Sequence, residues 1–293
     1  MPRPQFEGAH VPIVTPFRNG QVAEDVLRVL INRLIEQGVS GIVPCGTTGE
    51  SPTLSHEEHK RVLELSIEFI AGRVPVIAGT GSNSTDEAID LTKHAEAVGA
   101  DAALLVCPYY NRPSQAGLIA HFRKVAAATS LPLILYNIPK RTGVDMETAT
   151  VIELSRVDNI VGMKEASGDI NKAAEIMNGT QEFSVLTGED ILCFSMCCLG
   201  GKGGILAAAH VLPGEWVRMV SLIAEGQVAE ARKIHYRLMP LVKALFSETN
   251  PVPVKAAMEL MGIPVGPPRL PLLPASEACR QRVRVELERL GAL

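Results

Sequence analysis

The sequence predicts an α/β fold, a closed (β/α)8 TIM barrel with a C-terminal helical extension, and three observations support this. Short apolar runs rich in β-branched residues recur about every 20 to 33 residues, which is typical of strands buried on both faces. Amphipathic stretches of helical period separate most of these runs. Eight such units fill about 220 residues of the chain, whereas an open doubly wound sheet normally uses about five or six strands.

The expected elements alternate along the chain. Strands are expected at residues 10–15, 41–45, 75–79, 102–107, 132–137, 160–164, 184–187 and 203–207. The clearest helices are expected at 23–37, 55–71, 84–98 and 114–128. Ser55 and Glu58 have capping-box spacing at the second helix, and Gly38, Gly72 and Gly99 follow expected helix ends. We therefore expect residues 1–224 to form the catalytic barrel and 225–293, broken by several prolines, to form the extension.

Composition excludes several classes of function. The chain has 28 Lys and Arg against 32 Asp and Glu, a net charge of −4 and no basic run, so nucleic acid is not expected as a partner. No apolar run approaches the roughly 20 residues that span a bilayer, so no membrane partner is expected, and residues 1–10 do not resemble a signal peptide. Without a CxxC pair, Cys193, Cys197 and Cys198 are expected to be buried small hydrophobic residues. We expect a cytoplasmic protein.

Residues capable of chemistry cluster directly after the expected strands. In a barrel of parallel strands these positions meet at one rim, where active sites form. A threonine pair follows the second strand, a tyrosine pair the fourth, a tyrosine and an arginine the fifth, and a lysine ends the sixth. These residues are Thr47, Thr48, Tyr109, Tyr110, Tyr136, Arg141 and Lys164.

Lys164 is the most informative of them, because the run 160–163 carries its ammonium into an apolar barrel. Burial disfavours the charged form and lowers the pKa of a lysine, which makes the amine a nucleophile toward a carbonyl. At an unperturbed pKa of about 10.4 the neutral amine lies about 4.6 kcal/mol uphill at pH 7, and desolvation can remove much of that penalty. An ion pair with Glu165 or Glu189 is the structural alternative.

The neighbouring residues have similar alternatives. Tyr136 can transfer a proton or simply cover a strand end, and the Thr47–Thr48 pair can relay a proton, bind an acid or form a turn. Arg141 has the fork geometry that suits a carboxylate, although most loop arginines are only solvated.

Two further motifs resemble ligand sites without their full pattern. The glycine-rich run 200–204 lacks the Ser or Thr and the spacing of a phosphate loop, so we interpret its glycines as letting a ligand approach the eighth strand. His56 and His59 are spaced i and i+3, not i and i+4 as in zinc-binding helices, and by themselves are interpreted as surface residues. No metal is expected.

Three motifs together give the sequence a specific resemblance. They are Gly-Thr-Thr-Gly-Glu at 46–50, Tyr-Asn-Ile-Pro at 136–139 and Lys-Glu-Ala at 164–166. With them the chain resembles the pyruvate-dependent class I aldolases, a family that includes dihydrodipicolinate synthase and N-acetylneuraminate lyase, from about residue 6 to the Asn-Pro-Val-Pro-Val-Lys segment at 250–255. The doubled threonine, Tyr110 and Arg141 favour the dihydrodipicolinate synthase branch, because the lyase branch typically has Ser-Thr and lacks the arginine.

The resemblance implies a condensation of pyruvate with L-aspartate 4-semialdehyde in lysine and diaminopimelate biosynthesis. Lys164 would form an imine with pyruvate, and because this imine is the electron sink, no cofactor is expected. Tyr136 and Thr47, with Tyr110 reaching in from a neighbouring subunit, would relay protons. The residues that would hold the substrates are Thr48, with the pocket-lining Gly188 and Ile205, for pyruvate and Arg141 for the semialdehyde.

The resemblance also implies a homotetramer, a dimer of dimers, that L-lysine inhibits at a site on the dimer interface. The matching residues here are Ser51, His56, His59, Asn83, Glu87 and Tyr109. Two positions depart from the pattern: Pro52 stands where inhibited members often have Ala, and His210 replaces a frequent Asn. The first bears on the lysine pocket and the second on packing at a strand end.

Two other functions stay open. A sister aldolase acting on a sugar acid or 4-hydroxy-2-oxoglutarate would keep Lys164 and Tyr136 but would not need Arg141. A catalytically silent barrel that senses lysine would need the interface residues and not Lys164.

Overall fold

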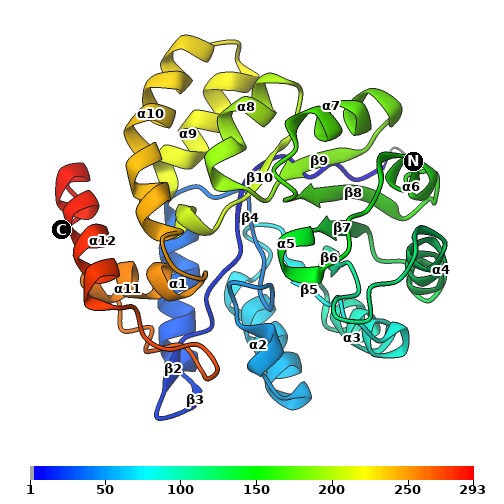
Figure 1. Ribbon diagram of the computed structural model, residues 1–293. Coiled ribbons are helices and arrows are strands. Elements are labelled where there is room, and N and C mark those ends of the chain that lie inside the picture. Colours follow the sequence, from blue (N-terminus) through cyan, green and yellow to red (C-terminus); the bar gives the residue numbers. More distant parts are fainter. Residues whose placement is uncertain (1–2) are drawn as a thin grey trace.

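Eight parallel strands form the centre of the computed structural model, which describes residues 3–293 (Figure 1). They are β1 (Gly8–Val11), β4 (Gly41–Ile42), β5 (Ile77–Gly79), β6 (Ala102–Val106), β7 (Leu133–Asn137), β8 (Ile160–Glu165), β9 (Ser184–Thr187) and β10 (Gly203–Ile205). Their order is β4-β1-β10-β9-β8-β7-β6-β5, and a parallel bridge between Ile42 and Val76 joins the two ends. The strands therefore form a nearly closed barrel, as predicted.

Helices surround the barrel and follow its strands in turn. They are α1 (Glu24–Glu36), α2 (His56–Ile70), α3 (Thr85–Val98), α4 (Gln115–Ala126), α5 (Pro139–Thr142), α6 (Thr148–Leu154), α7 (Ile170–Gly179), α8 (Cys193–Cys198) and α9 (Pro213–Ala224). Short 3-10 turns lie at η1 (Ser51–Thr53), η2 (Asp190–Leu192) and η3 (Ala207–His210). The predicted capping box is present at α2: the Ser55 hydroxyl accepts the Glu58 N–H, and the Glu58 carboxylate accepts the Ser55 N–H.

Several strand limits differ from the prediction because prolines interrupt the ladder. The first strand ends at Val11, since Pro12 has no N–H to donate, and the second ends at Ile42, shortly before Pro44. The prediction also missed the antiparallel hairpin of β2 (Phe17–Arg18) and β3 (Gln21–Val22). Asn19 and Gly20 form its turn with positive φ angles of 53° and 79°, and this Asn-Gly pair was a hairpin signal in the sequence.

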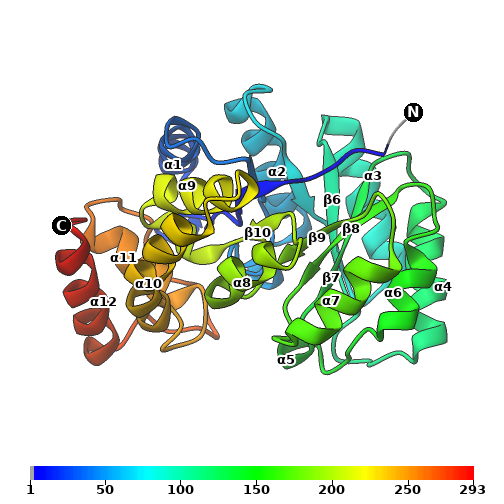
Figure 2. The same ribbon diagram turned by 90° about the horizontal axis from the view of Figure 1, so that it is seen from above.

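The C-terminal helices gather on one side of the barrel, away from α4 and α6 (Figures 1 and 2). They are α10 (Val228–Leu245), α11 (Val252–Leu260) and α12 (Glu277–Leu290). The extension is anchored by an ion pair between Lys255 of α11 and Glu50, whose side chains are each 2% exposed. This pair ties the extension to the loop that follows β4.

The glycine-rich run and the cysteines correct two expectations. A Cβ on Gly203 would overlap the carbonyl oxygen of Gly8, so this glycine allows β10 to approach β1 and does not admit a ligand. Cys193 and Cys197 are buried as predicted, but Cys198, at the end of α8, is exposed. Within residues 3–293, no helix is both long and apolar enough to cross a membrane.

Candidate active site

A cavity of about 850 Å³ opens where the carboxyl ends of the strands meet. β7 supplies Tyr136, β8 supplies Lys164 and β10 supplies Ile205, while the other lining residues come from segments that follow barrel strands and from α10 and the segment after it. Seven of the predicted catalytic and substrate-binding residues line it: Thr47, Thr48, Tyr136, Arg141, Lys164, Gly188 and Ile205. Residues up to 158 positions apart in the sequence thus converge because parallel strands present their carboxyl ends at one rim.

Lys164 is the buried lysine of this cavity. Its side chain lies within the barrel, 6% exposed, and its Nζ is 4.3 Å from the centroid of the Tyr136 ring. Glu165 instead accepts hydrogen bonds from Asn137 Nδ2 and the Ser167 N–H, and Glu189 pairs with Lys140 at 3.2 Å. Among residues 3–293, no carboxylate lies within 4.0 Å of Lys164 Nζ, so the ion-pair alternative for this lysine is not realised.

Gly188 leaves room for the lysine. A Cβ added at this position would lie 2.7 Å from Cε of Lys164 and 2.8 Å from Cβ of Ala166. Both contacts are shorter than real Cβ atoms tolerate, so any side chain here would displace the lysine stem.

Thr48 and Arg141 are held by the C-terminal extension. Asn250, between α10 and α11, donates from Nδ2 to the Thr48 hydroxyl oxygen at 2.9 Å. Its main-chain carbonyl accepts a hydrogen bond from Arg141 Nη2, also at 2.9 Å. Asn250 therefore holds two side chains of the cavity wall, Thr48 and Arg141, by hydrogen bonds.

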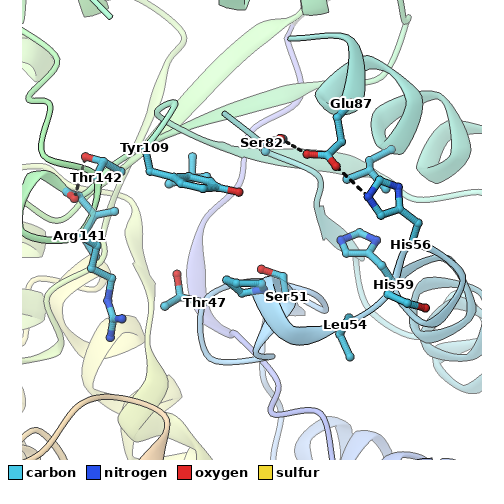
Figure 3. Close-up of a pocket in the computed structure, with 16 residues that line it drawn as sticks. Thr47, Ser51, Leu54, His56, His59, Ser82, Glu87, Tyr109, Arg141 and Thr142 are labelled. Atoms are coloured by element: carbon cyan, nitrogen blue, oxygen red, sulfur yellow. Dashed lines mark hydrogen bonds and ion pairs between the residues drawn. The ribbon is translucent and has the colours of Figure 1, made fainter. Parts of the chain in front are cut away.

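A second cavity has a volume of about 420 Å³, and Figure 3 shows the residues that line it. Ser51, His56, His59, Glu87 and Tyr109 of the predicted lysine site line it. His56 Nε2 is 2.8 Å from a carboxylate oxygen of Glu87, which also accepts a hydrogen bond from Ser82. Thr47 and Arg141 line both cavities, so the two share a wall.

Two predicted site residues do not reach either cavity in this chain. Tyr110 is 89% exposed, with a positive φ of 70°, and does not line either cavity. Asn83 does not line the second cavity, and its carbonyl accepts a hydrogen bond from Asn111.

Comparison with known proteins identifies the family of this chain. The model of the dihydrodipicolinate synthetase family matches residues 5–290. The chain belongs to this family. A 4-hydroxy-tetrahydrodipicolinate synthase from Syntrophobacter fumaroxidans is 51% identical over 290 residues, covering 98% of this chain and 100% of the relative.

Solved structures of the family have the same fold. Dihydrodipicolinate synthase from Aquifex aeolicus is 45% identical with a TM-score of 0.96, over 98% of this chain and 99% of that one. The enzyme from Cyanidioschyzon merolae, solved with lysine bound, is 42% identical with a TM-score of 0.96 over the same shares. These findings confirm the predicted resemblance, the barrel and the expectation of an enzyme, a lyase.

Sequence reasoning missed two residues that line the larger cavity. Asp190, in η2, lines the catalytic cavity at 3% exposure and accepts the Ala208 N–H at 2.6 Å. Burial raises the pKa of Asp190 to about 7, against the opposing effects of the Ala208 N–H and of Lys164. Its position after the seventh strand was a usable signal. The sequence signal for Asn250 was weaker. Nothing in the Asn-Pro-Val-Pro-Val-Lys segment itself indicates that this residue lies at the rim of the barrel.

The histidine expectations need a correction. His59 is not a surface residue: it is 6% exposed, its Nε2 lies 3.0 Å from the Gly79 carbonyl, and burial lowers its pKa to about 4. His210 is also buried, where Nε2 accepts the Val14 N–H and Nδ1 lies 2.8 Å from the Ala207 carbonyl. In the part of the chain that the structure describes, no three His, Cys, Asp or Glu side chains are grouped as metal ligands.

Proposed function

We propose that this family member condenses pyruvate with L-aspartate 4-semialdehyde to 4-hydroxy-tetrahydrodipicolinate, a step of lysine and diaminopimelate biosynthesis. The observation that carries the proposal is Lys164, buried without a carboxylate partner in a cavity that also presents Tyr136, two threonines and Arg141. Relatives about half identical to this chain are named 4-hydroxy-tetrahydrodipicolinate synthase, which supports the same reaction.

The lysine amine carries the chemistry through covalent intermediates. The neutral amine of Lys164 attacks the ketone carbon of pyruvate, and loss of water leaves a protonated imine. This imine accepts the electron pair of a methyl C–H bond when the proton leaves, which forms an enamine. The enamine carbon then bonds to the aldehyde carbon of the semialdehyde, whose oxygen takes up a proton. The amino group of the semialdehyde portion finally attacks the imine carbon, closes the ring and releases Lys164.

Hydroxyl groups move the protons in this proposal. Tyr136 and Thr47 line the cavity and each can donate and accept a proton. Tyr110 completes the relay only from a second copy of the chain, because its own ring is exposed and lies outside this cavity. The relay therefore requires at least a dimer, within the proposed homotetramer.

Substrate carboxylates meet positive and hydrogen-bonding groups on the cavity wall. The Thr48 hydroxyl and nearby main chain hold the pyruvate carboxylate, with Gly188 and Ile205 as backbone walls. Arg141 holds the carboxylate of the semialdehyde, which suits its fork of N–H donors.

L-lysine inhibits the enzyme from the second cavity. Glu87 offers a carboxylate for a lysine amino group, while Ser51, His56 and Tyr109 offer polar groups. Asn83 joins this site from across the dimer interface, since in its own chain it does not line the cavity. Exposed Pro52 is also among the residues that line this cavity.

The decisive experiment is trapping of the imine. The protein is incubated with pyruvate, reduced with borohydride and mapped by peptide mass spectrometry, with Lys164→Arg as the matched control. We expect one pyruvate-derived adduct at Lys164 and none in the control. No adduct, or an adduct on another lysine, would refute the mechanism and favour a ligand-binding barrel. An Arg141→Ala variant that keeps full activity with the semialdehyde would favour a sister aldolase.

A further inference from the structure

The C-terminal extension reaches the catalytic cavity through one side chain. Asn250 is 8% exposed and lies directly between α10 and α11, on the cavity wall. Its Nδ2 donates to Thr48 Oγ1 at 2.9 Å across 202 positions of sequence. Its carbonyl oxygen is fixed by Arg141 Nη2 at 2.9 Å, so the residue is held from the main-chain side as well.

The direction of the Asn250–Thr48 hydrogen bond decides where the threonine proton points. A hydroxyl has one O–H to donate and two lone pairs to accept with. Because Asn250 occupies a lone pair, the Thr48 O–H stays available, and no protein acceptor takes it among residues 3–293. In the present orientation one N–H of Asn250 donates to Thr48 and Oδ1 has no hydrogen-bond partner, whereas turning the amide over would leave both N–H groups unpaired.

The loop that carries Thr48 does not depend on Asn250 for its position. Glu50 of the same loop pairs with Lys255 and accepts the Arg269 N–H at 2.8 Å. The Thr15 hydroxyl donates to the Gly49 carbonyl at 2.6 Å. Loss of the Asn250 side chain should therefore leave the loop in place. Only the Thr48 hydroxyl should change, because it would be free to rotate.

We propose that Asn250 is a positioning residue that turns the Thr48 hydroxyl proton into the cavity, toward the carboxylate of the bound keto acid. The proposal rests on the proposed function and deepens it. A hydrogen bond from a hydroxyl to a carboxylate is stronger than one between neutral groups, so a preset donor direction favours the anion over neutral molecules of the same shape. The extension thereby contributes to keto-acid affinity without touching the reacting carbon.

The test is the pyruvate concentration that gives half-maximal adduct at Lys164 after borohydride, together with KM and kcat. We expect Asn250→Ala to raise the half-saturating concentration about 5- to 20-fold, with kcat reduced less than KM is raised. The Asn250→Asp variant keeps the size of the side chain but accepts the Thr48 proton, so we expect an increase at least as large. Asn171→Ala, at the exposed start of α7, serves as the control and should match the wild type.

The Thr48→Val background separates positioning from a structural effect. Once the hydroxyl is absent, Asn250→Ala should raise the half-saturating concentration less than twofold further. An equal increase in both backgrounds, or a wild-type value in either Asn250 variant, would overturn the inference. Failure of the wild-type protein to form the Lys164 adduct would instead refute the proposed function, so the two failures are distinct. Should Asn250→Ala not fold, the size-matched Asp variant gives the same decision.

Discussion

The buried ion pair between Lys255 and Glu50 allows a sharp prediction about stability. Both side chains are 2% exposed, and Lys255 Nζ also lies 4.4 Å from the centroid of the Phe17 ring. Burial lowers the pKa of Lys255, and the Glu50 carboxylate opposes this by favouring the ammonium. Replacing Lys255 with Met keeps the apolar stem but leaves a buried carboxylate whose remaining partner is the Arg269 N–H at 2.8 Å.

An uncompensated buried charge costs about 3–5 kcal/mol, whereas replacing both members of a buried pair is often neutral. We therefore expect Lys255→Met to lower the free energy of unfolding by about 3–5 kcal/mol, and Glu50→Gln combined with Lys255→Met to recover most of it. The measurement is urea unfolding followed by circular dichroism at pH 7.

The control is Lys233→Met, which removes a surface pair on α10 whose lysine is 72% exposed. Such pairs contribute about 0–1 kcal/mol, so this variant should unfold almost like the wild type. If Lys255→Met lost no more stability than Lys233→Met, or if the double variant were less stable than Lys255→Met, the reasoning about an uncompensated charge would be wrong.

Three further predictions follow from the structure. Gly188→Ala should lower kcat at least about tenfold and stability by about 1–3 kcal/mol, because the new methyl overlaps the Lys164 stem; steady-state rates and urea unfolding measure this, and wild-type kcat would contradict it. Burial lowers the pKa of four histidines to about 4: His10, His59, His121 and His210. Since the unfolded rings take up protons near pH 6.5, this contribution to stability is present above pH 6.5 and is lost as the pH falls toward 4, by about 2 kcal/mol per ring at pH 5. Equal unfolding free energies at pH 7 and pH 5 would refute this. Glu87→Gln should raise the lysine concentration for half inhibition at least about tenfold, whereas exposed Asp86→Asn on the same turn of α3 should not; inhibition curves at fixed pyruvate decide, and equal shifts would remove Glu87 from the lysine site.

Local sequence patterns were sufficient to find the barrel and seven of the residues that line the larger cavity. Buried parallel strands are apolar over consecutive positions, so each unit was visible by itself, and Ser55 with Glu58 marked a helix start that the structure has. Since every strand of a parallel barrel ends at the same rim, the position of Lys164 and Tyr136 at strand ends already implied that they meet.

Contacts between distant segments were decided only by the tertiary structure. Asn250 contacts Thr48 across 202 positions of sequence, and Lys255 pairs with Glu50. In both pairs, the sequence around one residue does not predict the other as its partner. The burial of His59 and the close approach of Gly203 to Gly8 are likewise properties of packed neighbours. A periodic pattern reports which face of one element is apolar, whereas hydrogen bonds and ion pairs between elements depend on how those faces are packed together, and that arrangement exists only in the folded chain.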